Sequence, residues 1–221
     1  MSTATELIDA IQRGAADEIA ALLAADPSVA DARHESGTTA LLLAIYHGQA
    51  AIAEQLAAVR QELSTWELAA LGRTSDLNLA LDTDPRALDA PADDGFRLLG
   101  LAAFFGHEST VALLLELGAD TSLAAENPTA VTALHSAVAF RDRDVGLANA
   151  RRLIAHGAPV DAAQQGGWTA LHAAAMHGNE PLVRLLLDQG ASLSFATDDG
   201  KTAAMMAEEA GHRELAALLS D

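Results

Sequence analysis

A short pattern recurs along almost the whole of this 221-residue chain and limits its possible folds more than any other feature. Its clearest copy, at residues 167–178, reads GWTALHAAAMHG, and the pattern opens again at residues 200–203 with GKTA. Self-similarity at a period of a few tens of residues indicates stacked units, each of which packs only against its neighbours. The chain is therefore expected to form one elongated domain, although its length alone would allow two globular ones.

Each copy can be aligned on an anchor residue that opens its first helix. The anchors are Thr5, Thr39, Leu63, Arg97, Thr132, Thr169 and Thr202, which lie 34, 24, 34, 35, 37 and 33 residues apart. A threonine suits this position because its hydroxyl can accept a hydrogen bond from an unpaired N–H group of the first turn. A glycine stands nine residues after six of the seven anchors, where the first helix can end in a left-handed conformation. Each unit is therefore predicted to be a helix, a tight turn, a second helix and an extended loop.

The Thr-Ala-Leu-His tetrapeptide at residues 169–172 is followed by paired alanines, a glycine, a Leu-Leu pair and a Gly-Ala step. This order resembles the ankyrin repeat, whose period is about 33 residues. The resemblance implies an all-α ankyrin-repeat solenoid of about seven helix-turn-helix units, including N- and C-terminal caps, in a single domain over residues 1–221. The units are expected at approximately residues 3–36, 37–61, 62–94, 95–129, 130–166, 167–199 and 200–221. Glu208 stands where other units have alanine, so we expect the last unit to be a cap and the chain to be complete.

The step from Thr39 to Leu63 is shorter than the others by about the length of one extended loop. We therefore predict a short connection near residues 61–64. Projecting finger loops are expected near residues 90–95, 124–130, 164–167 and 196–200. The unit that follows the short step is degenerate, and it carries Trp66.

Composition restricts the possible partners. The formal net charge of −18 disfavours nucleic acid and anionic membranes, because binding to phosphates requires Lys and Arg. A basic or apolar protein or peptide is favoured instead. The chain has no cysteine, and no apolar stretch approaches the roughly 20 residues needed to span a bilayer. We expect a cytoplasmic monomer that binds neither nucleic acid nor membrane.

The eight histidines are candidates for metal binding or acid–base chemistry. His135 and His172 stand in Thr-x-x-His segments, where the resemblance implies a structural role. The chain lacks the histidine pair of a helical zinc site and any glycine-rich phosphate loop. The carboxylate pair Asp93-Asp94 falls in an expected finger loop, where acidic residues suit turns. We therefore predict no catalytic residue, no metal site and no cofactor.

The resemblance further implies a partner-binding concave face built from finger tips and first helices. Contacts in such a face are expected at the residue before each anchor and at the seventh and eighth residues after it. In this chain these positions include Tyr46, His47, Phe96, Phe104, Phe105, Phe140, Trp168, Met176 and His177. Aromatic and methionine side chains are common anchors of protein interfaces. The aromatic rings can also serve only to cover a neighbouring helix, and their partial exposure would separate the two roles.

Two functions are compatible with these observations. The first, implied by the resemblance, is non-enzymatic binding of a protein or peptide partner on the concave face. The alternative is a small-molecule-binding or enzymatic role at the degenerate unit around Trp66, which is the second full unit after the N-terminal cap. A long shallow groove would favour the first function, whereas a deep closed pocket with perturbed titratable groups would favour the second.

Overall fold

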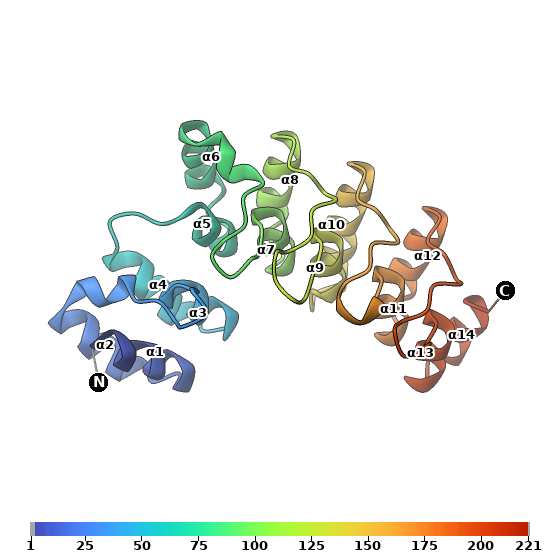
Figure 1. The fold of residues 1–221 in the computed structure, drawn as a ribbon, viewed down its shortest axis with the longest axis horizontal. Coiled ribbons are helices and arrows are strands. Elements are labelled where there is room, and N and C mark those ends of the chain that lie inside the picture. Colours follow the sequence, from blue (N-terminus) through green and yellow to red (C-terminus); the bar gives the residue numbers. More distant parts are fainter. Residues whose placement is uncertain (1–2, 221) are drawn as a thin grey trace.

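The computed structural model describes residues 3–220 and shows helix pairs stacked along one long axis (Figure 1). These residues form fourteen α-helices and three short 3-10 helices. The α-helix pairs are α1 (Thr3–Arg13) with α2 (Ala16–Ala25), α3 (Ala40–Tyr46) with α4 (Ala50–Val59), α5 (Thr65–Leu71) with α6 (Thr74–Thr83), α7 (Leu98–Phe104) with α8 (Glu108–Glu116), α9 (Ala133–Ala139) with α10 (Arg143–Ala155), α11 (Ala170–Met176) with α12 (Glu180–Asp188), and α13 (Ala203–Glu209) with α14 (Arg213–Leu218). The 3-10 helices are η1 (Pro27–Asp31), η2 (Pro85–Leu88) and η3 (Gln165–Gly167). The predicted all-α solenoid of about seven units is confirmed.

The pair α11–α12 shows why the repeated sequence forms this unit. Thr169 caps α11, since its hydroxyl and its backbone N–H lie 2.8 and 3.1 Å from Nδ1 of His172. The helix ends before Gly178, whose φ of +62° is left-handed. A Cβ atom on Gly178 would also lie 2.5 Å from the ring of His212 in the next unit. Both conformation and space therefore require glycine at this turn.

Finger loops project at the four predicted positions, and a further finger lies between α2 and α3. Isolated antiparallel bridges close four of them, at Arg33–Thr39, Pro91–Arg97, Gln164–Trp168 and Ala196–Thr202. A fifth is closed by a 2.8 Å hydrogen bond from Ala125 N to Val131 O. Between α4 and α5 the chain has only residues 60–64, so the predicted loss of one finger is confirmed.

Two anchors need correction. The residue that caps α5 is Ser64, not Leu63. Its hydroxyl accepts from the backbone N–H of Glu67, and the Glu67 side chain accepts in return from the backbone of Ser64. This is a capping box, for which Ser and Glu three residues apart are the sequence signature. Thr5 also does not open the first helix, because α1 already includes Thr3.

The fingerless connection divides the hydrophobic core. One cluster of buried residues extends from Leu7 to Ala57 and the other from Leu68 to Leu219, and Leu63 packs against both. In Figure 1 the helices α1–α4 lie together at the N-terminal end, and an extended segment connects α4 to α5. Because a repeat protein is stabilised by its nearest-neighbour interfaces, the junction between α3–α4 and α5–α6 is the point at which the stack is easiest to separate.

A buried polar network crosses this junction. The side chain of Glu67 is fully buried and forms an ion pair with Arg60, which is 13% exposed. Its carboxylate also accepts a 2.7 Å hydrogen bond from the hydroxyl of Thr39, the anchor of the preceding unit. Nε of Arg60 in turn lies 2.9 Å from Asp31. Side-chain hydrogen bonds thus join the two parts of the stack where the finger is missing.

Among residues 3–220, one amide side chain has both of its polar atoms buried and unpaired. Asn149 of α10 is fully buried, and neither Nδ2 nor Oδ1 has a hydrogen-bond partner. The same register position is held by buried leucines at Leu77 and Leu182. An unpaired buried amide opposes folding because it loses its hydrogen bonds to water.

Replacing Asn149 with leucine is therefore expected to raise the free energy of unfolding by about 1–3 kcal/mol. Urea unfolding followed by circular dichroism measures the change. Asn179 provides the matched control, since it is also buried but its Oδ1 accepts from the N–H of Leu182 at the start of α12. Asn179→Leu should be destabilising by about 1 kcal/mol. A loss of stability in Asn149→Leu would contradict the proposed penalty.

Candidate partner-binding groove

A hollow of about 520 Å³ lies between the first helices and the finger loops. Its floor comes from α7, α9 and α11, and Tyr46 at the end of α3 closes one side. We call this hollow the groove; it is lined by Tyr46, Phe96, Gly100, Leu101, Phe104, Thr129, Val131, His135, Ser136, Ala139, Gln164, Trp168, Ala173, Met176 and His177. The structure thus brings together six of the nine predicted contact residues, namely Tyr46, Phe96, Phe104, Trp168, Met176 and His177.

The groove presents apolar surface to solvent. Phe104 is 47% exposed and Met176 is 36% exposed, whereas Trp168 and Phe96 are half-buried. Large apolar side chains gathered in one open hollow are typical of interaction sites rather than of an ordinary solvated surface. These four side chains are therefore not part of the fully buried core.

Polar groups mark one end of the groove. Oη of Tyr46 donates a 3.0 Å hydrogen bond to Oδ2 of Asp94, a finger residue. Burial, and then the charge of Asp94, raise the pKa of Tyr46, so the phenol stays protonated and keeps donating. The ring of Tyr46 also contacts Phe96 edge-on, with centroids 6.0 Å apart. Tyr46, Phe96 and Asp94 therefore form one rigid corner.

The three other predicted contact residues lie outside this lining. Phe105 stacks on Tyr46 with ring centroids 6.1 Å apart. The ring of Phe140 covers Gly106, where a Cβ atom would come within 2.2 Å of it. His47 is exposed at the C-terminal end of α3. Phe105 and Phe140 thus support neighbouring structure, and a direct contact with a partner stays a prediction for all three.

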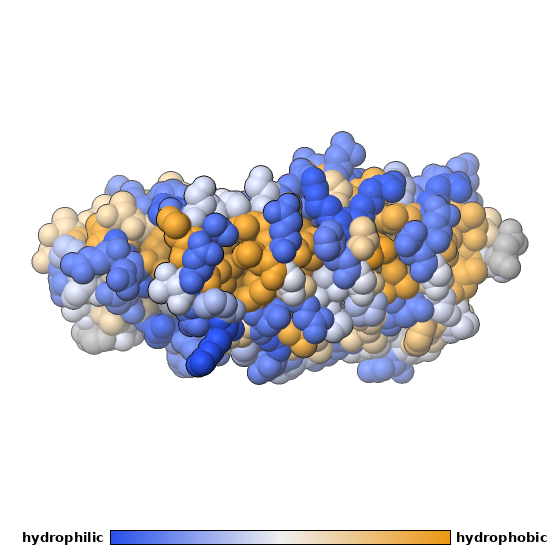
Figure 2. Space-filling model, turned by 90° about the horizontal axis from the view of Figure 1, so that it is seen from above, coloured by the Kyte–Doolittle hydropathy of each residue, from blue (hydrophilic) through white to orange (hydrophobic). Residues whose placement is uncertain are grey.

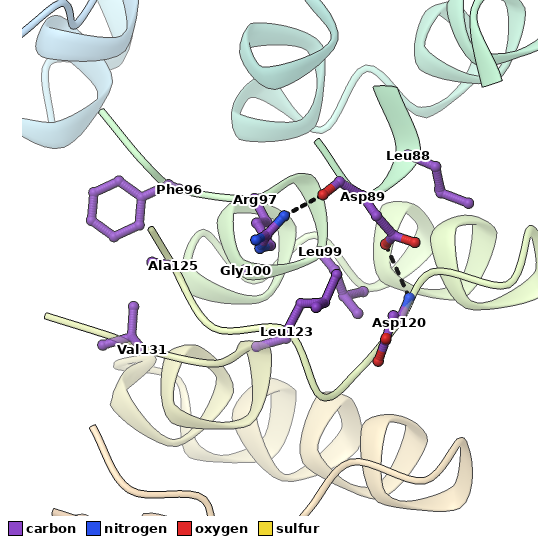
Figure 3. Close-up of a pocket in the computed structure, with 11 residues that line it drawn as sticks. Leu88, Asp89, Phe96, Arg97, Leu99, Gly100, Asp120, Leu123, Ala125 and Val131 are labelled. Atoms are coloured by element: carbon purple, nitrogen blue, oxygen red, sulfur yellow. Dashed lines mark hydrogen bonds between the residues drawn. The ribbon is translucent and has the colours of Figure 1, made fainter. Parts of the chain in front are cut away.

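Arg97 replaces the usual threonine at the opening of α7, and Gly100 replaces the usual histidine three residues later. The Arg97 guanidinium donates to the carbonyl oxygens of Asp89 and Ala124 and to the carboxylate of Glu126. Figure 3 shows Arg97 beside Gly100, with its hydrogen bond to Asp89. The void at this point is about 10 Å³, which is no more than the space of about one water molecule. The cation is therefore a structural tether between neighbouring loops.

Sequence reasoning missed Arg97 and Glu67 as tethers, although both had a recognisable pattern. For Arg97 the signal was an arginine at the anchor position with glycine, not histidine, three residues later at Gly100. For Glu67 the signal was the segment Ser64-x-x-Glu67, which has the sequence of a capping box. Asp94 was identified only as a turn residue. Its hydrogen bond with Tyr46 joins segments 48 residues apart in the chain, and local spacing does not reveal such a pairing.

His135 and His172 are structural. In each, Nδ1 accepts from the backbone N–H of the capping threonine, at 3.2 and 3.1 Å. Nε2 lies 3.2 Å from Trp168 O and 3.1 Å from Phe195 O. Because a carbonyl oxygen can only accept, Nε2 carries the proton and both rings are neutral. Within residues 3–220 no group of three or more histidine and acidic side chains is placed to hold a metal ion.

Acidification is expected to lower stability through these two rings. Burial lowers the pKa of His135 and of His172 in the folded chain. In the unfolded chain the pKa of histidine is about 6.5. Between these two pKa values the unfolded chain binds more protons than the folded chain. Stability is then fully present above about pH 6.5 and declines as the pH falls. Urea unfolding at several pH values should show a smaller decline in the variant H135Q/H172Q than in the native chain. Parallel declines would contradict this assignment.

The region around Trp66 offers little space. The hollow between Trp66 and the first finger has a volume of about 40 Å³, whereas sites for small molecules usually measure about 300–1,000 Å³. Nε1 of Trp66 donates to Ala90 O at 3.2 Å, which holds the ring against the next loop. The geometry here is that of packed structure rather than of a deep pocket.

The opposite side of the molecule differs from the groove. Figure 2 shows the face on the side of α6, α8, α10 and α12, where apolar groups along the length are interrupted by hydrophilic side chains. Leu79 of α6 is 65% exposed. This leucine is a useful reference for experiments, since it is large, apolar and exposed but lies outside the groove.

Stacked helix pairs with projecting fingers and a groove across the first helices define a helical-repeat solenoid. Residues 145–221 match the family model described as ankyrin repeats in three copies. A transient receptor potential cation channel subfamily A member 1 homolog of Caenorhabditis elegans is 36% identical over 146 residues, 66% of this chain. Calmodulin-binding transcription activator 4 of Arabidopsis thaliana is 44% identical over 75 residues, 31% of this chain. The protein is an ankyrin repeat-containing protein.

The similarity covers a small part of these relatives. The matched segment spans 11% of the channel homolog and 7% of the transcription activator. In diacylglycerol kinase zeta of Rattus norvegicus, 36% identical over 92 residues, it spans 10% of the relative and 41% of this chain. The shared feature is thus the repeat segment.

Proposed function

We propose that this chain is a non-enzymatic recognition module that binds a protein or peptide partner in the groove. The observation that carries the proposal is the gathering of Phe104, Trp168 and Met176 in one open hollow, with two of these side chains at least 36% exposed. Such side chains favour association because partner binding removes their apolar surface from water. Ankyrin repeats are generally protein-interaction modules, which supports the same reading.

Two of the three titratable side chains that line the groove, Tyr46 and His135, also favour binding over catalysis, while the third, His177, is exposed. Tyr46 donates to Asp94, and both ring nitrogens of His135 are occupied by its capping threonine and by Trp168 O. A general acid or base needs a lone pair or proton directed at a substrate. Groups committed to internal hydrogen bonds supply stiffness instead.

The relatives support the same choice. Proteins named as a channel homolog, a transcription activator and a kinase share a segment of 7–11% of their lengths with this chain. A segment common to proteins with such different names fits a recognition role better than one particular chemistry.

Site-specific photo-crosslinking tests the proposal. A benzophenone amino acid at position 104, in the groove, is expected to capture a protein from a lysate of the organism that encodes the chain. The same group at position 79 on α6 serves as the control, because Leu79 is more exposed than Phe104. Capture from position 79 but not from position 104 would overturn the proposed location. A captured protein supports the proposal only if Trp168→Ala in the same chain abolishes the crosslink.

A further inference from the structure

On the floor of the groove, α7 has a glycine in place of a histidine. Gly100 follows Arg97 by three residues, as His135 follows Thr132. Its φ is not positive, so the backbone at this position does not require glycine, which is disfavoured inside helices. A Cβ atom on Gly100 would have as its nearest neighbour Oγ of Ser136, at 3.9 Å. The small residue therefore leaves space that any larger residue would occupy.

Aromatic and aliphatic groups surround this space. Phe96 and Trp168 come from two different fingers, and Phe104 and Met176 come from α7 and α11. All four line the same hollow of about 520 Å³. An occupant that fills the space above Gly100 meets a mostly apolar lining, in which Oγ of Ser136 is the nearest atom to the Gly100 Cβ position. An apolar group therefore suits this space best.

A negative charge lies at the end of the groove that Tyr46 closes. The carboxylate of Asp94 accepts from the neutral donors Tyr46 Oη, Thr38 Oγ1 and Phe96 N. Within residues 3–220 no ion pair involves Asp94, although the neighbouring Asp93 pairs with Arg33. The rings of Tyr46 and Phe96, the residues that supply two of these donors, contact each other edge-on. A carboxylate without an ion-pair partner favours a cation through its charge.

We infer that the occupant of the groove is an extended peptide segment with one bulky apolar side chain, which seats above Gly100, and a nearby Arg or Lys, which contacts Asp94. This inference rests on the proposed function and adds the chemistry of the partner. The net charge of −18 acts in the same direction, because the field of the whole molecule repels acidic segments and attracts basic ones. A peptide suits the site better than a small molecule because the hollow opens along a row of units from α3 to α11.

Selection from a phage-displayed library of random peptides on the full chain tests the inference. Recovered peptides are expected to share a bulky apolar residue with Arg or Lys close to it. Gly100→Leu should weaken their binding by about 30-fold or more, because the leucine occupies the anchor position. Gly100→Ala should weaken it much less, since its Cβ makes only an ordinary contact with Ser136. Leu79→Ala should leave binding unchanged.

The charge is tested separately with Asp94→Asn, which keeps an oxygen to accept from Tyr46. This variant should weaken the basic peptides by about threefold or more and reduce the salt dependence of their binding. Melting curves establish that each variant is folded, and Gly100→Ala remains informative if Gly100→Leu is not.

Three outcomes would overturn the inference. The first is that the recovered peptides are acidic. The second is that neither Gly100→Leu nor Gly100→Ala changes their affinity, and the third is that Asp94→Asn leaves the affinity for basic peptides unchanged. If position 104 still captures a protein in a manner that depends on Trp168, the proposed function survives each of these outcomes. If neither the capture nor the binding of the selected peptides depends on the groove, both proposals fail. Displacement of an apolar dye from the groove by small molecules would then show that the occupant is a small molecule.

Discussion

Replacing Glu67 with alanine is expected to lower the free energy of unfolding by about 3 kcal/mol or more. The carboxylate is fully buried, and its removal leaves the Arg60 guanidinium, which is 13% exposed, with Asp31 as its one remaining charged partner among residues 3–220. It also leaves the hydroxyl of Thr39 without its 2.7 Å acceptor. A buried charge that loses its partner is among the most destabilising changes that a folded chain can suffer.

Glu54 provides the matched control for Glu67. It too pairs with an arginine near the same junction, Arg73, but its side chain is 61% exposed. An exposed ion pair contributes about 1 kcal/mol or less, so Glu54→Ala should have little effect. The double variant Arg60→Met with Glu67→Leu should recover much of the loss, because neither charge then remains buried alone.

In the Glu67→Ala chain the two parts of the stack should also unfold in separate transitions. Trp66 and Trp168 both lie at or beyond the junction, whereas circular dichroism reports on all helices. In the Glu67→Ala chain the helical signal is therefore expected to begin falling in urea before the tryptophan fluorescence changes, as α1–α4 unfold first. Coincident transitions with a loss below about 1 kcal/mol would refute this account of the junction.

Truncating Trp168 to alanine is expected to weaken partner binding by about 2 kcal/mol or more, which is roughly 30-fold. The indole ring is half-buried and lines the groove. Its structural hydrogen bonds use the backbone carbonyl, which accepts from Gln164 N and faces His135, and these remain in the variant. The loss of stability should therefore stay below the roughly 3–5 kcal/mol of a fully buried aromatic.

Phe140 should behave in the opposite way. Its ring covers Gly106 rather than lining the groove, so Phe140→Ala is expected to reduce stability more than binding. Isothermal titration with the captured partner, together with urea unfolding, separates the two effects. Equal effects of Trp168→Ala and Phe140→Ala on binding would show that the contact surface extends beyond the groove.

Much of the architecture could be predicted because the same residue pattern recurs in each unit, so that one unit helps to identify the next. The spacing of threonine and glycine along the chain located the helix pairs, and the short step after Thr39 located the missing finger. These are local requirements: caps, left-handed turns and helical stripes depend on residues a few positions apart. The exact anchor of the degenerate unit was misplaced by one residue, since Leu63 and Ser64 are adjacent and only the hydrogen bonds of Ser64 distinguish them.

The candidate groove was predictable only in part. Repeat register placed nine residues on one expected face, but register does not reveal how far a side chain reaches or what it packs against. Phe105 and Phe140 are both the eighth residue after their anchors, yet Phe105 stacks on Tyr46 and Phe140 covers a glycine of the preceding unit. The difference follows from the loop geometry after each first helix, which changes where α10 begins.

The sequence by itself determined the repeat, the number of helix pairs and the faces of those helices, because each of these depends on interactions within one unit or between adjacent units. Tertiary structure alone decided which distant residues meet. It paired Tyr46 with Asp94, placed Glu67 against Thr39 and Arg60, and opened the groove above Gly100. Such pairings depend on the curvature and packing of the whole stack, which are sums of small rotations between units and are not encoded in any single repeat.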